Sequence, residues 1–140
     1  MKTLVVYYSL SGKTKKVATE QAEKESADII EVKEKKPYSI LTAFVLGAYA
    51  AKKQKTVEIE ALKCDFTAYD KIILAAPIWG GFPAPPMNTV ITMMPAGKDV
   101  AFVLTSGSGD SSKRAAKIKE LVTKQGCRVV GYTDVKSSSL

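Results

Sequence analysis

The chain has 140 residues, of which 46% are hydrophobic and 25% charged, and we expect residues 1–140 to form a single globular domain. It contains no histidine, which excludes His-dependent catalytic triads and His-ligated zinc enzymes. The net charge is +7, but the lysines are scattered and no stripe of basic and aromatic residues marks a groove, so we expect a charged surface and no nucleic-acid partner.

Strand and helix signals alternate along the chain. Runs of apolar and β-branched residues predict strands at 4–8, 29–32, 71–76, 100–104 and 128–132. Amphipathic stretches between them predict helices at about 13–26, 38–55, 87–94 and 115–122, the last ending near Gly126. This alternation indicates an α/β fold with a doubly wound parallel sheet. The serine-rich tail 136–140 is expected to be frayed.

No part of the sequence predicts export or membrane insertion. The first three residues lead directly into a strand, so we expect no signal peptide. The longest nearly uncharged run, residues 38–51, is too short to span a bilayer. Cys64 and Cys127 are isolated and suit a reducing compartment. These features predict a cytoplasmic protein without a membrane span.

The segment after the first strand has the pattern of an anion site. Ser9-Leu10-Ser11-Gly12-Lys13-Thr14 places a glycine turn and three hydroxyls at the start of a helix. Backbone N–H groups at a helix N-terminus, helped by the helix dipole, can hold a phosphate. Ser11 or Thr14 could instead serve only as a helix cap, but three hydroxyls around one glycine exceed what a cap requires.

A P-loop is the alternative for this segment, because Gly12-Lys13-Thr14 matches the last three residues of that motif. The full motif needs a glycine five places before Gly12, where this chain has Tyr7. The later strands also lack an aspartate placed to hold magnesium. The sequence therefore favours another kind of phosphate site, and a P-loop nucleotide-binding protein is the remote alternative.

Two further segments follow predicted strands. Pro77-Ile78-Trp79-Gly80-Gly81 contains the only tryptophan, which we expect in a loop, stacked on a flat ring; packing in the core is the alternative. Thr105 begins the other segment, in which Asp110 or the following serine could be only a helix cap. Its candidate binding residues are Ser106, Gly107, Ser108, Gly109 and Asp110.

Taken together, these three segments resemble those of the flavodoxin family. The resemblance spans essentially the whole chain and implies a flavodoxin-like sheet of five parallel strands in the order 2-1-3-4-5, with helices on both faces. It implies FMN as cofactor, with its phosphate on Ser9, Ser11, Gly12, Lys13 and Thr14. Ile78 and Trp79 would flank the flavin ring, a backbone carbonyl near Gly80 would meet the ring nitrogen protonated on reduction, and residues 106–110 would contact the ring's carbonyl edge.

The resemblance implies a redox protein that transfers electrons, but it leaves several roles open. The chain could be an electron carrier between proteins, an FMN-dependent NAD(P)H:quinone-type reductase, or a flavin-binding module without turnover. Flavodoxins are usually acidic, whereas this chain is basic. Many also have a second aromatic residue in the last loop, which is absent here. The expected partners are a redox protein or a small acceptor such as a quinone, with NAD(P)H as a candidate donor and the protein a monomer or homodimer.

Overall fold

The computed structural model describes residues 2–35 and 56–140, so the helix predicted at 38–55 lies outside the described residues. The strands are β1 (Thr3–Tyr7), β2 (Asp28–Glu31), β3 (Lys71–Trp79), β4 (Phe82–Pro83), β5 (Asp99–Ser106) and β6 (Arg128–Lys136). The α-helices are α1 (Lys13–Glu25), α4 (Pro85–Met93) and α5 (Ala115–Thr123). Short 3-10 helices are η2 (Phe66–Ala68), η3 (Ser112–Arg114) and η4 (Ser137–Ser139).

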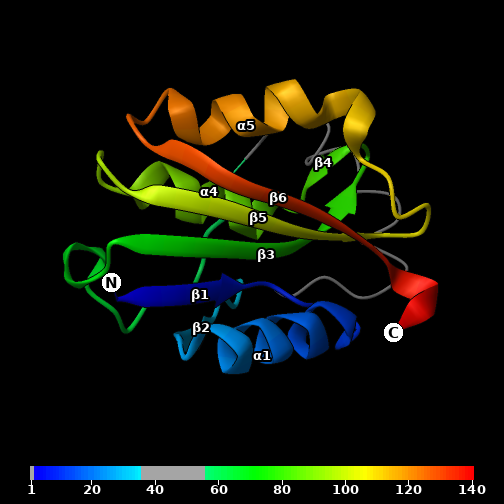
Figure 1. Cartoon of the computed structure of the whole chain (residues 1–140), viewed down its shortest axis with the longest axis horizontal. Helices are drawn as coiled ribbons and strands as arrows, with labels where there is room; N and C mark the ends of the chain where they lie inside the picture. The colour runs from blue at the N-terminus through cyan, green and yellow to red at the C-terminus, as the bar shows by residue number, and fades with distance from the viewer. Residues whose placement is uncertain (1, 36–55) are drawn as a thin grey trace.

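Five of the described strands form a parallel sheet in the order β2-β1-β3-β5-β6 (Figure 1). When the two-residue β4 is left out, β1, β2, β3, β5 and β6 are strands 1 to 5 in chain order. The predicted order 2-1-3-4-5 is therefore confirmed. The short β4 is an addition that pairs antiparallel with β3. Winding proceeds from β1 outward to β2, and then from β3 in the opposite direction. The direction of winding therefore switches between β1 and β3, where ligands commonly bind in such sheets.

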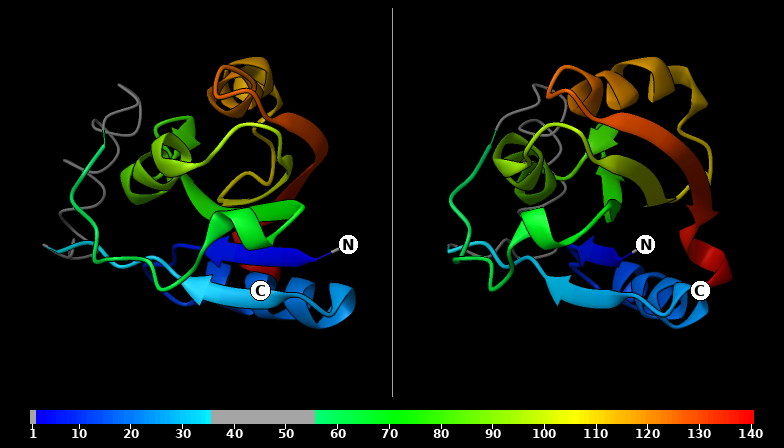
Figure 2. Two further views of the ribbon diagram at one scale, coloured as in Figure 1. Left: turned by 90° about the vertical axis from the view of Figure 1, so that its left-hand side faces the viewer. Right: turned by 60° about the vertical axis from the view of Figure 1, so that its left-hand side comes forward.

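Helices cover both faces of the sheet, as predicted (Figure 2). On one face Val17, Ala18 and Ala22 of α1 pack against alternate residues of β1, β3 and β5. On the other, α4 and α5 contribute buried residues such as Val90 and Ile118 to a larger core. The central strands are almost fully buried because side chains of both faces are covered, which explains their continuous apolar sequence.

Two strands are longer than predicted. β3 continues through Trp79, since Pro77 still pairs with Thr105 of β5 and the last residues pair with β4. The predicted loop 77–81 is therefore wrong in its first three residues, which lie on the strand. β6 continues to Lys136, which pairs with Ser106, and η4 follows it. The tail predicted to be frayed is therefore ordered through strand pairing and a 3-10 turn.

The outer strand β6 contains an irregularity. The register with β5 shifts between Val100 and Ala101, which pair with Val129 and Gly131 respectively. Val130 is thereby left as an extra residue, with 46% of its surface exposed. Within residues 2–35 and 56–140, no helix is long and apolar enough to cross a membrane.

Candidate functional site

Three loops meet at one edge of the sheet. They follow β1, β3 and β5, which are neighbours in the sheet. Because parallel strands all end at the same edge, the loops lie together at the right-hand end of the molecule in Figure 1. The structure thus brings together all three segments that the sequence pattern singled out.

The first loop leads into α1 through Gly12. Gly12 is the N-cap residue, has a left-handed backbone (φ 93°), and no side chain caps the helix. Neither Ser11 nor Thr14 is therefore a cap, which removes the alternative interpretation of these hydroxyls. The Gly12 N–H donates instead to Ser9 Oγ at 3.0 Å, and this bond closes the turn. The N–H groups of the first helical turn have no partners within the helix and remain as donors for an anion.

Residues of this loop differ in exposure. Ser11, Gly12 and Lys13 are exposed, and Ser9 is half-buried. Thr14 is only 2% exposed, and its hydroxyl oxygen lies 2.8 Å from that of Thr105, itself 3% exposed. This contact joins the start of α1 to the end of β5. Thr14 therefore links the first and third loops, a role that its position in the sequence did not predict.

Trp79 lies at the end of β3 rather than in a loop. It pairs with Phe82, and Ile78 pairs with Pro83, across the two-residue turn Gly80-Gly81. Both glycines have positive φ, 60° and 92°, and a hairpin turn with two such residues matches the right-handed twist of its strands. The tight hairpin therefore fixes the backbone position of Trp79.

The Trp79 side chain is half-buried and packs at the margin of the larger core. Tyr8 approaches it edge to face, with ring centroids 5.7 Å apart and an interplanar angle of 83°. The Tyr8 hydroxyl donates to Glu34 Oε1 at 2.9 Å, and Glu34 is buried. Trp79 thus contacts the core, as the core-packing alternative predicted, and also remains partly accessible, as stacking on a flat ring would require.

The third loop is held together by its own side chains. Ser106 Oγ accepts a hydrogen bond from Gly109 N, and Ser108 Oγ accepts one from Asp110 N. Asp110 Oδ1 accepts from Ser112 N at 2.9 Å. Hydrogen bonds from the Ser112 side chain and backbone hold the pKa of the exposed Asp110 carboxyl below its usual value. Ser111 occupies the N-cap position of η3 and no side chain caps this helix, so the alternative interpretation of Asp110 as a helix cap is wrong; Gly107 and Ser108 are exposed.

A cluster not predicted from the sequence holds the end of this loop to β6. The buried Ser111 donates from its backbone N–H to Asp134 Oδ2 at 3.0 Å and from its hydroxyl to Asp134 Oδ1 at 2.6 Å. Its Oγ also lies 2.5 Å from the Tyr132 hydroxyl. Burial raises the pKa of Tyr132 above its ordinary value. More than 20 residues separate these partners, and no motif connects them.

Comparison with known proteins identifies the family. Residues 2–132 match the family model described as Flavodoxin. The chain belongs to the flavodoxin family. Among solved structures, this family member is similar to a flavoprotein from Lactobacillus acidophilus in complex with FMN (29% identity, TM-score 0.79, covering 94% of this chain and 91% of that one). No curated protein sequence matches the chain.

Two other structures extend the comparison. The apo form of the Lactobacillus acidophilus flavoprotein has 27% identity and a TM-score of 0.73, covering 98% of this chain and 95% of that one. A Streptococcus pneumoniae flavodoxin has 16% identity and a TM-score of 0.60, covering 96% of this chain and 84% of that one. The latter similarity concerns the fold alone. The fold and the family predicted from the sequence are thus confirmed.

Proposed function

We propose that this protein binds FMN at the three loops and transfers electrons through it. The observation that carries the proposal is the start of α1, where no side chain caps the N–H groups of the first turn and the exposed Ser11 lies beside them. Such donors fit a terminal phosphate without a metal ion. The L. acidophilus flavoprotein, similar over nearly the whole chain, is a complex with FMN. When bound, FMN supplies the redox chemistry that the side chains lack.

The remaining loops fit the flavin ring. Trp79 offers a partly exposed aromatic face on a rigid hairpin, and ring stacking on it would orient the flavin. The loop 106–110 offers backbone and hydroxyl groups for the polar edge of the ring. The Ser106 and Asp110 side chains and the N–H groups of Gly109 and Asp110 are engaged within the loop, so we assign its contribution chiefly to its other backbone groups. The free cysteines Cys64 and Cys127 accord with a cytoplasmic location.

A reductase is the second candidate function, and one observation favours it. The loop 106–110 contains no aromatic residue, so the flavin face opposite Trp79 would be open to a nicotinamide or a quinone. Mixing the FMN-loaded protein with NADPH, with no other protein present, separates the two functions. Rapid bleaching of the flavin absorbance indicates a reductase, and a flavin that stays oxidised indicates a carrier.

The phosphate assignment is tested by comparing FMN with riboflavin in a fluorescence titration. We expect FMN to bind much more tightly, because each charge-assisted hydrogen bond to its phosphate contributes about 1.5–3 kcal/mol. Ser11→Ala should lower the affinity for FMN and leave that for riboflavin unchanged. Thr19→Val, in α1 but beyond the loop, is the matched control. Equal affinities for FMN and riboflavin would refute the assignment.

A further inference from the structure

The positive charge of the protein is concentrated on one described segment. Residues 112–124, which comprise η3, α5 and the C-cap residue Lys124, carry five basic side chains and one acidic side chain, Glu120. Elsewhere in the described residues, acidic and basic side chains occur in almost equal number. The rest of the excess lies in the sequence 36–55, outside the described residues. The basic segment consists of Lys113, Arg114, Lys117, Lys119 and Lys124.

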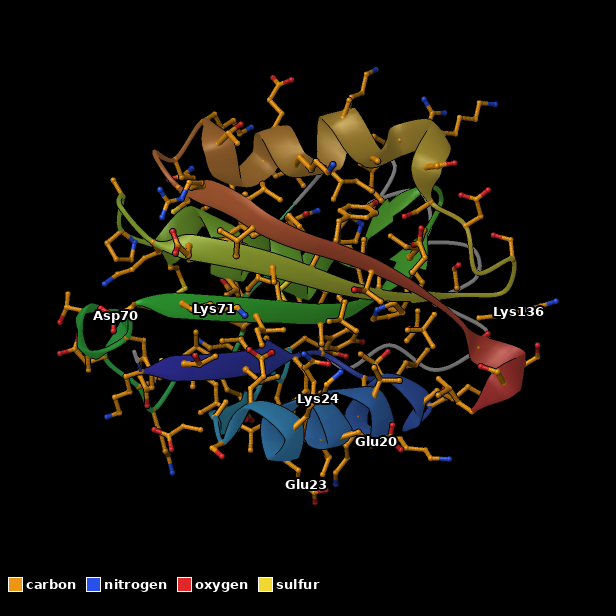
Figure 3. All side chains as sticks on the ribbon, in the orientation of Figure 1. Glu20, Glu23, Lys24, Asp70, Lys71 and Lys136 are labelled. Atoms are coloured by element: carbon orange, nitrogen blue, oxygen red, sulfur yellow. The ribbon has the colours of Figure 1, made fainter. Side chains whose placement is uncertain are left out.

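These charges are available to a partner. Its four lysines are exposed, and Arg114 is half-buried. None of the ion pairs among residues 2–35 and 56–140 includes a member of the segment. Figure 3 shows nitrogen-tipped side chains, with an oxygen-tipped one among them, on the outer side of η3 and α5, directed away from the sheet. Because five positive charges stand against the single carboxylate of Glu120, the segment produces a positive potential over this surface.

The basic segment borders the candidate flavin site. The Arg114 guanidinium lies 5.8 Å from the centre of the Phe82 ring. Phe82 follows the hairpin turn and pairs with Trp79, which precedes the turn. A Cβ at Gly81 would lie only 3.4 Å from Cγ and Nε of Arg114, so this side chain covers the turn. A protein bound along α5 would therefore stand beside the proposed flavin.

We propose that the η3–α5 surface is the docking site of an acidic electron-transfer protein; this inference rests on the proposed function. The exposed large apolar residues of the described chain, Ile29, Met93 and Val130, all lie outside the segment, so contact there would be electrostatic and short-lived. Small, polar interfaces of that kind are typical of electron-transfer encounters. The apolar side of α5 is buried against the sheet, so the helix has none to insert into a membrane, and without aromatic residues it is less suited to nucleic-acid bases.

The probe for this proposal is a plant-type [2Fe–2S] ferredoxin, used as a small acidic redox protein. We expect it to shift the amide NMR signals of residues 112–124 in the FMN-loaded protein and to bind less tightly as salt rises. Replacing Lys113, Lys117 and Lys124 together by Gln should weaken binding about tenfold at low ionic strength. The rate at which reduced ferredoxin passes one electron from its cluster to the flavin should fall by a similar factor.

The matched control replaces Lys24, Lys33 and Lys63 by Gln, which removes the same charge from exposed positions elsewhere. It should alter binding and rate less than twofold. Equal losses in both variants, or salt-independent binding, would overturn the proposal, since net charge or another surface would then be responsible. Binding of the segment to phosphatidylserine vesicles but not to ferredoxin would also overturn it, in favour of a membrane.

The experiment distinguishes a failure of the proposed FMN site from a failure of the proposed docking surface. FMN affinity is measured on every variant, and binding of oxidised ferredoxin is measured by NMR on the flavin-free protein as well. Ferredoxin shifts at 112–124 in a protein that binds no FMN would support the docking surface and refute the flavin site. FMN binding without ferredoxin shifts would do the reverse.

Discussion

The hydroxyl oxygens of Thr14 and Thr105 lie 2.8 Å apart, although 91 residues separate them in the chain. Thr14 belongs to the first turn of α1 and Thr105 to the end of β5. Both are buried, so the two hydroxyls satisfy one another where water has little access. This contact couples the loop proposed to hold the phosphate to the loop proposed to hold the flavin ring.

Thr14→Val and Thr105→Val should each destabilise the fold, because each leaves a buried hydroxyl without this partner. We expect a loss of about 1–3 kcal/mol for either variant and a smaller additional loss for the double variant, since an apolar pair leaves neither group unsatisfied. Urea unfolding of the four proteins measures the coupling. Strictly additive losses would show that the hydroxyls do not interact.

Gly109→Ala should damage the third loop, whereas Gly107→Ala two residues earlier should not. Gly109 has φ 72°, and a Cβ there would lie 2.7 Å from Cβ of Lys136 on β6. The combined backbone strain and overlap should cost about 1–3 kcal/mol and lower FMN affinity. Gly107 has open space around it and serves as the matched control. Thermal unfolding and flavin titration of both variants provide the comparison; similar behaviour of the two would contradict the packing described.

The hydrogen bond between Tyr8 and Glu34 should determine how the Trp79 ring is held. Tyr8→Phe keeps the ring edge against Trp79 but removes the donor to the buried carboxylate. Because Trp79 is the only tryptophan, its emission reports on this position alone. We expect a shifted emission maximum in the flavin-free protein and weaker quenching by FMN.

Tyr69→Phe is the control for this variant, since Tyr69 donates a similar bond, at 2.7 Å, to Asp28. It lies before β3 begins, whereas Trp79 is the last residue of that strand. Its emission should match the wild type. An unchanged spectrum for Tyr8→Phe would mean that the hairpin alone positions Trp79.

Stability should fall in acid partly through Glu25. Lys71 Nζ lies 2.7 Å from Glu25 Oε1, and both side chains are about three-quarters buried. This hydrogen bond is the main reason why the pKa of Glu25 lies below its ordinary value. Since the folded-state pKa lies below the unfolded one, the stabilisation is complete above about pH 5 and is lost as the pH falls through the folded value.

Glu25→Gln should therefore destabilise the protein by about 1 kcal/mol at pH 7, and by progressively less as the pH falls. Glu23→Gln, an exposed position on the same helix, should leave the pH profile unchanged (Figure 3). Urea unfolding from pH 3 to 7 tests this. A constant difference between Glu25→Gln and wild type across that range would contradict the pair's role.

Local patterns were sufficient for the fold and for the three loops. The buried run at 71–76 and the helix start at Lys13 have strong signals because burial and turn chemistry act on neighbouring residues. The end of β3 was not predictable, since Pro77 and Trp79 remain on the strand only through pairing with β4 and β5. Gly80-Gly81 is a hairpin-turn signal, but its partner strand has only two residues.

Contacts across the sheet were likewise not predictable. Ser111 meets Asp134, and Tyr8 meets Glu34, through strand order and register rather than through spacing in the sequence. The excess of basic residues at 112–124 can be counted in the sequence, but the position of Arg114 against the hairpin turn at Gly81 could not be predicted from it. Such features require the tertiary structure.

The extra residue Val130 on β6 has a consequence for self-association. Among the described strands β6 is the outermost on its side of the sheet, and an outer strand offers a template on which a second chain could add. The register shift at Val100/Ala101 interrupts the regular ladder there, and a bulged strand twists more strongly than a regular one. Arg128 and Lys136, at the two ends of the strand, are exposed and charged. The irregularity thereby protects an outer strand of nine residues against aggregation by strand addition.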